Sequence, residues 1–440
     1  MVRPGFVACV GWLLAWCPLL CLAGDWRQFR GPEGQGHAET NEAPIRWSES
    51  ENIAWKVPVE GGGWSSPVVL GDQVWLTTAI ETPGSAADLD AALERVGMPV
   101  PSPRVAGRVQ LMAVCFDRDS GRLLHKAKLF DVDEPVILCA VNSYASPTPA
   151  AEAGRLYCDF GAMGTACLNT ETGEIVWTRQ LMIEHQVGPG SSPILYGDLL
   201  VLTRDGCDQQ YVTALDKRTG KTVWKTDRPT LSTKVLPFRK AFSTPLVFAY
   251  NGGEQMVVPG AQWIVSYEPA SGRELWRVDT GPTFSNSSSP SFSDGLVFCT
   301  TAYGGTYLVA IRPDGAGDTT DSHVAWQTQR SVPRMPSPLA LGDELYMVSD
   351  SGVVSCLDAE SGDIHWSERL GGKFSASPVA AAGRVYCFSE EGDAHVIAAD
   401  KEFAPVAENS LDGTIKGTPA FVDGVIILRT DSHLYRIGSS

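Results

Sequence analysis

The side chains that most often do chemistry in enzymes are dispersed along this sequence. There is no GxSxG segment for a nucleophilic serine, no HExxH helix for a catalytic zinc and no glycine-rich phosphate loop. Isolated histidines on strands and turns are usually packing or surface residues. The seven histidines stand singly, at His37, His125, His185, His323, His365, His395 and His433. The sequence therefore gives no support for a hydrolase, and we predict no metal site.

A proline that follows a small, Ser-, Thr- or Ala-rich segment recurs eight times. After a longer first interval, consecutive copies lie 40 to 52 residues apart, the length of one propeller blade. The eight are Pro67, Pro147, Pro193, Pro245, Pro290, Pro338, Pro378 and Pro419. Between them, as in Ser191–Trp224, short β-rich runs alternate with Gly/Asp turns. This pattern indicates small antiparallel sheets repeated along the chain.

Most copies end in a Ser/Thr-Gly turn with a tryptophan four residues after the glycine. Trp177, Trp224, Trp276 and Trp366 occupy this place, Trp326 ends the fifth copy after an insertion, and His125 replaces the tryptophan in the first. The eighth copy stops at Ile437 after three strands, and Asn52–Val57, with Trp55, can supply the fourth. We therefore predict an all-β, eight-bladed β-propeller over residues 52–438, with four-stranded antiparallel blades. Its N-terminal strand completes the C-terminal blade, which removes the free sheet edges.

The segment Ala214–Trp224 resembles the tryptophan-docking repeat of the pyrroloquinoline-quinone (PQQ) propellers. Cys167–Trp177 and Cys356–Trp366 match it as well, and Ser266–Trp276 is a looser copy. The resemblance implies that each indole packs on the neighbouring blade, in a structural ring of Trp55, Trp177, Trp224, Trp276, Trp326 and Trp366. More narrowly, the segments Asp25–Gly31, Asn52–Lys56, Asn142–Pro149, Gly188–Pro193 and Arg429–Ile437 are similar to secreted PQQ-like propeller proteins.

Quinoprotein alcohol dehydrogenases share this repeat, so the resemblance raises PQQ and Ca²⁺ as cofactors. Those enzymes place two adjacent cysteines beside the quinone and hold Ca²⁺ with a Glu/Asn/Asp set. Here no two cysteines are adjacent and no CxxCH haem site is present. Asn142 and Asp205 are candidate ligands, but their spacing does not select them. We expect no cofactor, and a PQQ- and Ca²⁺-dependent oxidoreductase is the alternative.

The eight cysteines after residue 23 mostly occupy equivalent positions in different copies. Such positions are too far apart to form disulfides, so we expect small buried side chains. The exception is Cys158 with Cys167, which face each other if Gly161–Gly164 makes a simple hairpin turn. This pair is a predicted disulfide.

In a propeller, the connections into the first strands and the turns between the second and third strands lie at one end. In an otherwise acidic chain, five cations converge on this funnel mouth, and focused positive potential attracts anions. The five are Arg239, Lys240, Arg334, Lys373 and Lys416. The predicted ligand-binding residues of this funnel are Trp64, Asn142, Tyr144, His185, Arg204, Asp205, Arg239, Lys240, Arg334, Asp350, Lys373, Lys416, Arg429 and Asp431. We predict no catalytic residue among them. For a carbohydrate ligand, the contacts would be Trp64, Tyr144, Trp263 and Tyr303.

The flanking segments indicate export. Residues 1–23, with Arg3 before the apolar run Phe6–Leu22, have the layout of a cleaved signal peptide. Leu20 disfavours a lipid anchor at Cys21, and Pro18 with the short run disfavours a transmembrane segment. Residues 24–51 are predicted to form an arm that packs across the ring. Residues 81–109 are an insertion in the first blade, with a short helix at Ala86–Val96.

The formal charge of −16 argues against nucleic acid as a partner. We therefore expect a monomeric, extracytoplasmic (periplasmic or secreted) protein that serves as a non-catalytic binding or assembly scaffold. Its partner would be a protein, or an anionic small molecule or polysaccharide, bound at the insertion-bearing end. A carbohydrate-binding module is a further alternative.

Overall fold

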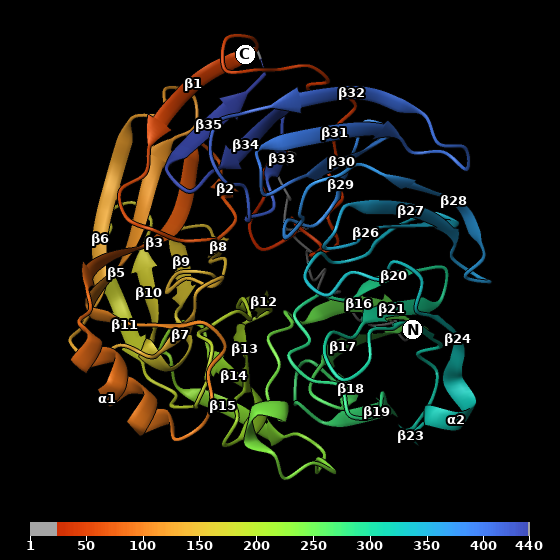
Figure 1. The fold of residues 1–440 in the computed structure, drawn as a ribbon, viewed down its shortest axis with the longest axis horizontal. Helices are drawn as coiled ribbons and strands as arrows, with labels where there is room; N and C mark the ends of the chain where they lie inside the picture. The colour runs from red at the N-terminus through yellow and green to blue at the C-terminus, as the bar shows by residue number, and fades with distance from the viewer. Residues whose placement is uncertain (1–23, 439–440) are drawn as a thin grey trace, which may run out of the picture.

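In a computed structural model, residues 24–438 are described and form a ring of eight blades around a central axis (Figure 1). Each blade is an antiparallel sheet of four strands, and its first strand lies nearest the axis. The predicted all-β, eight-bladed propeller is confirmed. The predicted signal peptide lies outside the described residues.

The blades follow one another in chain order. Blades 1 to 4 consist of β2 (Val68–Leu70), β3 (Gln73–Pro83), β5 (Ala106–Asp117) and β6 (Leu123–Val132); β8 (Ala150–Glu152), β9 (Arg155–Asp159), β10 (Thr165–Asn169) and β11 (Ile175–Arg179); β12 (Ile194–Tyr196), β13 (Leu199–Asp205), β14 (Gln210–Asp216) and β15 (Thr222–Asp227); and β16 (Leu246–Tyr250), β17 (Gly253–Pro259), β18 (Trp263–Tyr267) and β19 (Glu274–Asp279), with β23 (Gly317–Asp318) added parallel to β19.

Blades 5 to 8 repeat this order. They consist of β20 (Ser291–Ser293), β21 (Leu296–Thr300), β22 (Leu308–Ile311) and β24 (Val324–Thr328); β25 (Leu339–Leu341), β26 (Glu344–Val348), β27 (Val353–Asp358) and β28 (Ile364–Arg369); β29 (Val379–Ala381), β30 (Arg384–Phe388), β31 (Asp393–Ala398) and β32 (Pro405–Ser410); and β33 (Ala420–Val422), β34 (Val425–Arg429), β35 (His433–Ile437) and β1 (Ile53–Pro58). The short helix α2 (Thr320–His323) precedes β24.

The N-terminal strand closes the ring, as predicted. β1 pairs antiparallel with β35, with Ile53 opposite Ile437 and Pro58 opposite His433. A strand from the start of the chain thus becomes the outermost strand of the last blade. β1 therefore covers the outer side of β35, which would otherwise be the open edge of a three-stranded blade.

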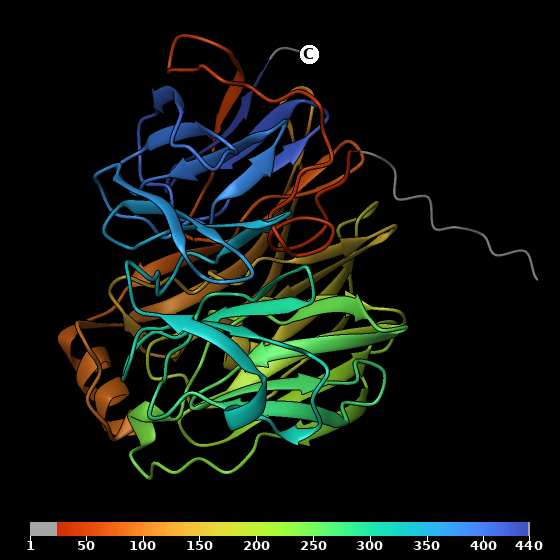
Figure 2. The same cartoon turned by 90° about the vertical axis from the view of Figure 1, so that its right-hand side faces the viewer.

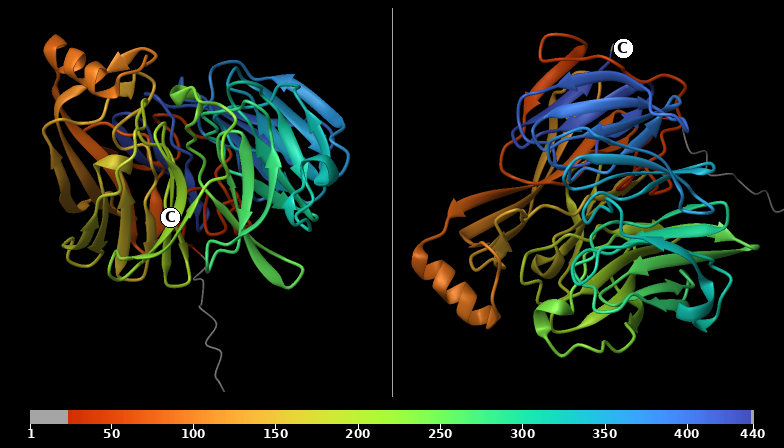
Figure 3. Two further views of the ribbon diagram at one scale, coloured as in Figure 1. Left: turned by 90° about the horizontal axis from the view of Figure 1, so that it is seen from below. Right: turned by 45° about the vertical axis from the view of Figure 1, so that its right-hand side comes forward.

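The insertion in blade 1 extends the two middle strands and carries a helix. Helix α1 (Ala86–Val96) begins in a capping box made by Ser85 and Asp88 and ends at Gly97, which has φ +63°. The predicted helix at these residues is confirmed. Beside it, β4 (Pro103–Arg104) pairs with β7 (Leu138–Cys139), and Ala92 of the helix packs with Val100 and Ile137. Both views of Figure 3 show α1 standing out from the blades.

Hydroxyl groups next to the axis join consecutive blades. The Ser or Thr before the proline of the first strand donates its backbone N–H to the hydroxyl oxygen of the corresponding residue in the next blade. Six such bonds, of 2.9 to 3.0 Å, run from Ser66 to Thr148, Thr148 to Ser192, Ser192 to Thr244, Ser289 to Ser337, Ser337 to Ser377 and Ser377 to Thr418. All eight residues are buried, so these bonds satisfy N–H groups that water does not reach.

The pattern of these hydrogen bonds shows that the repeat proline predicted for the second blade, Pro147, is wrong. In the other seven blades the first strand begins immediately after the repeat proline, and in blade 2 it begins at Ala150. Thr148 accepts from Ser66 and donates to Ser192, so Thr148-Pro149 occupies the repeat position in place of Pro147. The sequence Ser146-Pro147-Thr148-Pro149 contains two candidate pairs, and only the strand register distinguishes them.

At the outer edge, aromatic rings lie against the glycine turn of the following blade. The indoles of Trp55, Trp177, Trp224 and Trp326 lie against Gly121, Gly220, Gly272 and Gly362, so closely that an added Cβ would come within 2.9 Å of the ring. Four indole N–H groups donate across the blade junction, at 2.9 to 3.1 Å: Trp55 to Arg118, Trp177 to Lys217, Trp326 to Ala359 and Trp366 to Asp400. Trp276 differs, because its N–H donates to Gln255 of its own blade.

The arm that precedes β1 crosses the channel and contacts the inner edges of several first strands. Trp26 exchanges backbone hydrogen bonds with Val69 of blade 1, and Gly36 and Ala38 bond to Ala380 of blade 7. Arg30 is fully buried between them and donates to the carbonyls of Pro290 and Pro338 in blades 5 and 6. Burial lowers the pKa of Arg30 to about 9. The arm packs across the ring, as predicted.

The predicted disulfide between Cys158 and Cys167 is wrong. The turn contains the 3₁₀ segment η1 (Gly161–Met163), and the register places Cys158 opposite Ala166 and Cys167 opposite Tyr157. Because side chains alternate along a strand, the two cysteines point to opposite faces of the sheet. Accordingly, Cys158 packs between blades 1 and 2, and Cys167 packs toward blade 3. All eight cysteines of the described part of the chain are free.

The hydroxyl ring can be tested by removing one acceptor. Ser337→Ala leaves the buried N–H of Ser289 without a partner, so we expect a loss of about 1–3 kcal/mol of unfolding free energy in urea. Ser289→Ala is the matched control, because the Ser289 hydroxyl accepts no hydrogen bond from the described residues. Equal losses in the two variants would contradict the account.

The packing of tryptophan on glycine predicts a difference between two turn glycines of blade 3. Gly220 (φ +70°) would place a Cβ 2.7 Å from the Trp177 ring, whereas Gly197 (φ +53°) has no atom within 4 Å of that point. Both alanine variants bear the strain of a left-handed backbone, about 1–2 kcal/mol. We expect Gly220→Ala to lose about 2 kcal/mol more than Gly197→Ala by thermal or urea unfolding. A smaller loss for Gly220→Ala would show that the indole does not hold this junction.

Candidate functional site

One end of the ring carries the residues that the sequence places at a funnel. Helix α1 and the 3₁₀ segment η2 (Leu236–Phe238), between blades 3 and 4, lie at this end, which we call the insertion end. In Figure 2 both lie on the left, and the red loops of the arm near the axis lie toward the right. The channel therefore has an insertion end, with loops of every blade, and an opposite end covered by the arm.

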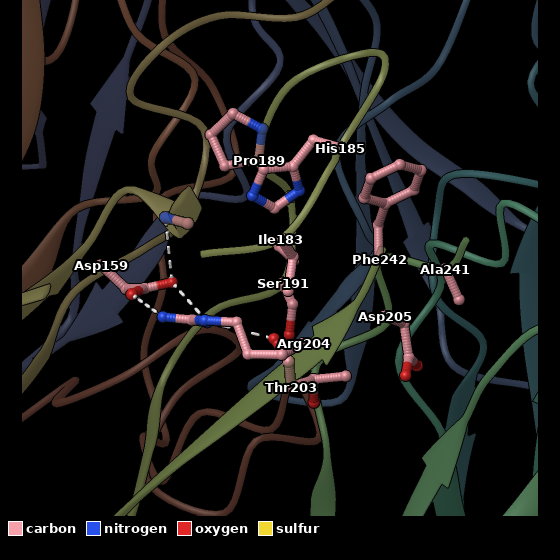
Figure 4. A pocket seen from close by; sticks show the side chains of 12 residues that line it. Asp159, Ile183, His185, Pro189, Ser191, Thr203, Arg204, Asp205, Ala241 and Phe242 are labelled. Carbon is pink, nitrogen blue, oxygen red and sulfur yellow. Dashed lines mark hydrogen bonds and ion pairs between the residues drawn. The ribbon is translucent and has the colours of Figure 1, made fainter. Parts of the chain in front are cut away.

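The structure brings His185, Arg204 and Asp205 together, but it buries all three. Arg204 is 1% exposed and forms a bidentate ion pair with Asp159 of blade 2 (Figure 4). Its two terminal nitrogens lie 2.6 and 3.1 Å from the two carboxylate oxygens. Asp205 pairs with Arg228 at 2.7 Å. Burial raises the pKa of the Asp205 carboxyl, and the Arg228 guanidinium opposes that rise. These charges are matched within the protein, as buried ions must be.

His185 lies against this network as a neutral side chain. Its Nε2 accepts from the backbone N–H of Ala162 at 3.0 Å, so the ring proton is on Nδ1. Burial, and secondarily the charge of Arg204, lower the pKa of His185 to about 3. A Cβ on Gly161 would meet Nε2 at 2.2 Å, so the close approach of the ring requires glycine at this turn.

The space beside His185 is small. The cavity lined by His185, Thr203, Arg204 and Phe242 has a volume of about 10 Å³, which is the size of one water molecule (Figure 4). Pockets for organic ligands are usually ~300–1,000 Å³. This part of the predicted site therefore joins blades 2, 3 and 4 and offers no room for a larger molecule.

Four further predicted residues also make contacts within the protein. The Asn142 amide donates to Val187 and Pro189, and the Tyr144 hydroxyl accepts from Ala106. Arg429 is 2% exposed and donates to Ser65 and Thr77 of blade 1. Burial lowers the pKa of Arg429 to about 10. Lys240 is buried and donates to Gln186 and Pro237, and desolvation lowers its pKa.

The remaining predicted residues lie nearer the surface, where most of them have partners. Arg239 donates to Gln210, and Arg334 lies 3.6 Å from Asp350, which also accepts its backbone N–H. Lys416 lies 3.6 Å from Glu390 and over the ring of Trp64. Asp431 accepts from the N–H of Thr414, and Lys373 is exposed. The structure thus divides the predicted cations among several junctions.

The structure adds an exposed stack of aromatic rings at the insertion end, which we call the aromatic ledge: Phe238, Phe284 and Tyr303. The centroids of Phe238 and Phe284 are 4.5 Å apart, and those of Phe284 and Tyr303 are 5.7 Å apart. The Arg334 guanidinium lies 5.3 Å from the Tyr303 centroid and extends the stack. Phe238 and Tyr303 of the ledge are 43% and 51% exposed, and the neighbouring chain residues Val235, Leu236 and Met335 are 42% to 50% exposed.

Sequence reasoning selected Tyr303 and Arg334 here, but it missed Phe238 and Phe284. Phe238 directly precedes Arg239, which the sequence did select, and Phe284 lies in the connection into blade 5. The available signal was the presence of large apolar residues in these connections, as in Val235-Leu236-Pro237-Phe238. These residues can be recognised as one surface only when the structure shows that three different connections meet.

A comparison with protein families assigns the chain. The family model PQQ_2, described as outer membrane protein assembly factor BamB, matches residues 109–261, 208–347 and 335–407, which together exceed half of the chain. The chain belongs to the PQQ_2 family. A comparison with curated protein sequences gave no match.

Solved structures share the fold of this PQQ_2 member at low sequence identity. BamB from Moraxella catarrhalis has a TM-score of 0.58 at 12% identity, over 88% of this chain and 99% of that one. Quinohemoprotein alcohol dehydrogenase from Comamonas testosteroni has a TM-score of 0.64 at 10% identity, over 95% and 81%. The computationally designed Ika8 protein has a TM-score of 0.57 at 11% identity, over 87% and 98%. At these identities the likeness shows the fold alone.

The channel residues do not fit a Ca²⁺–quinone group. The two buried carboxylates beside the cavity, Asp159 and Asp205, are each paired with an arginine. Among residues 24–438, no group of three or more His, Cys, Asp or Glu side chains is arranged to hold a metal ion. The nearest cavity is of water size. A bound quinone would require both ion pairs and the blade junction to rearrange.

Burial of neutral His185 predicts a pH-dependent stability. Its pKa is about 3 when folded and 6.5 when unfolded. The unfolded chain therefore binds the extra proton first, so stability is full above pH 6.5 and falls as the pH drops toward 3. Between pH 7 and 4 this group contributes a loss of about 3 kcal/mol. We expect His185→Gln to remove that part of the slope in urea unfolding, whereas an unchanged slope would mean that His185 titrates normally.

Proposed function

We propose that this PQQ_2 protein is an exported, non-catalytic scaffold that binds a partner protein at the insertion end. The observation that carries the proposal is the aromatic ledge, where large apolar side chains are held exposed beside Arg334. Aromatic residues and arginine supply most of the binding energy in protein interfaces. A rigid scaffold that presents them at one end suits binding, whereas the matched charges of the channel do not suit catalysis.

The comparisons support the class of this function. The family model is described as an outer membrane protein assembly factor, and the chain covers 99% of the Moraxella catarrhalis BamB structure. An assembly factor acts by holding other proteins, so the analogy favours a protein partner. We further propose a periplasmic or secreted location after cleavage of residues 1–23, with the mature protein as a monomer. No helix among the described residues is long and apolar enough to cross a membrane.

The principal alternative is a PQQ- and Ca²⁺-dependent oxidoreductase. The fold likeness to the Comamonas testosteroni alcohol dehydrogenase extends over 95% of this chain, and this observation favours the alternative. Against it stand the water-sized cavity beside His185 and the paired carboxylates Asp159 and Asp205. A carbohydrate-binding role would use the predicted aromatic contacts, but Tyr144 is buried and the Trp263 face is covered by Arg277.

The scaffold proposal predicts position-dependent crosslinking in cells that make the protein. A photoreactive phenylalanine analogue at Tyr303 or Met335 should give a covalent adduct with another protein, because both positions are exposed at the ledge. The same analogue at Val223, which is 53% exposed on the outer strand β15, is the matched control and should give no adduct. Denaturing gels followed by mass spectrometry measure the adducts.

Two outcomes would contradict the proposal. One is equal crosslinking from Val223 and Tyr303, which would mean that the insertion end is not the binding face. The other is tight, Ca²⁺-dependent binding of PQQ by the purified mature chain together with dye-linked alcohol oxidation. The first result would rule out the insertion end as the binding site, and the second would show that the protein is an oxidoreductase.

A further inference from the structure

We propose that the aromatic ledge binds an acidic segment of the partner, whose carboxylates meet Arg334 and the ring edges while its apolar side chains contact the exposed ring carbons. This inference rests on the proposed function and specifies the chemistry of the partner.

The ledge is rigid before it binds anything. Phe284 and Tyr303 exchange backbone hydrogen bonds of 2.9 and 3.2 Å, which fixes two of the three rings relative to each other. Asn286 donates to Gly260 and accepts from Ala302. The chain before blade 4 is joined to the same connection, because Ser285 donates to the Lys240 carbonyl. A preformed surface loses little conformational freedom when a partner binds.

The local charge favours an acidic partner. Cationic side chains border the rings, although the whole chain carries −16. Arg334 and Lys240 lie over the rings of Tyr303 and Phe284, and Lys234 and Arg239 belong to the connection that supplies Phe238. The side-chain nitrogens of Arg334 make no hydrogen bond with the described residues, and its nearest carboxylate, Asp350, is 3.6 Å away. Asp350 faces Nε of Arg334, which leaves the two terminal nitrogens without a hydrogen-bond partner among the described residues. A planar guanidinium with these two donors is suited to a bidentate carboxylate.

The geometry of the stack favours a peptide over a sugar as the ligand of the ledge. Sugars bind aromatic residues by lying on an open ring face. Here the Phe284 ring stacks with both Phe238 and Tyr303, and Lys240 lies over it, so little of its face is open. The Arg334 guanidinium lies over the Tyr303 ring. Phe238 and Tyr303 remain 43% and 51% exposed, and an aromatic edge carries partial positive charge. Edges flanked by cations attract carboxylates and exclude cationic segments.

The test uses fluorescence anisotropy with the mature protein and short labelled peptides. The probe alternates glutamate with phenylalanine. One comparison peptide has lysine in place of glutamate, and another has alanine in place of phenylalanine. We expect only the first to bind, and we expect its affinity to fall as NaCl rises, since exposed charge pairs are screened.

Variants of the protein locate the site. Arg334→Ala and Tyr303→Ala should each weaken probe binding by about tenfold or more, equivalent to about 1.4 kcal/mol. Arg334→Lys should retain part of the affinity, because it keeps the charge but loses the planar stack. Arg218→Ala removes an exposed arginine from the turn between β14 and β15 and is the matched control, which should bind normally.

Three results would overturn the inference: equal binding of the lysine peptide, affinity that is independent of salt, or binding of a neutral polysaccharide that Tyr303→Ala abolishes. Absence of probe binding would also overturn it. If crosslinking from Tyr303 persists in that case, the scaffold function stands and only the acidic chemistry is wrong. If crosslinking from Tyr303 is also absent, the proposed function fails as well.

Discussion

The fold depends on a hydrogen bond that is repeated at the axis, from the N–H before one blade's repeat proline to the hydroxyl of the next blade. Eight first strands converge there, and proline supplies no N–H of its own. The residue before it would leave a buried donor unpaired if the neighbouring blade carried no acceptor. A hydroxyl supplies that acceptor in little volume, which explains the serine or threonine at the six positions that accept this bond. The outer tryptophans hold the same junctions at the other edge of the sheets.

This way of closing the ring limits where the protein can act. The arm occupies one end of the channel, with the buried Arg30 at its centre. At the other end, ion pairs such as Arg204 with Asp159 bridge adjacent blades. Groups that resemble a reactive site in the sequence are thus used to hold blades together. What is left for recognition is the surface of the insertion end, where the connections are free to vary without disturbing the junctions.

Much of the fold could be predicted from the sequence because each blade repeats a local signal. A proline marks the first strand, and a Gly turn with a tryptophan marks the last, so the blade count and the strand exchange follow from spacing. Register could not be predicted in this way. Two adjacent Ser/Thr-Pro pairs made blade 2 ambiguous, and one residue in the turn after β9 decided that Cys158 and Cys167 face apart.

The candidate site was harder to predict for a related reason. Position in the repeat says at which end of the ring a residue lies, but not whether its side chain points to solvent or to the next blade. His185 and Arg204 lie at the predicted end and are buried. The aromatic ledge depends on side chains from three connections, and no local pattern relates them.

The most direct measurement is hydrogen–deuterium exchange of the mature chain with and without the partner captured by crosslinking. The account predicts slower exchange in the connections that build the ledge, at residues 228–242, 280–287, 301–307 and 329–336, with the first strands and the arm unchanged. Slower exchange in the arm or along the channel would contradict it, because the partner would then bind at the axis.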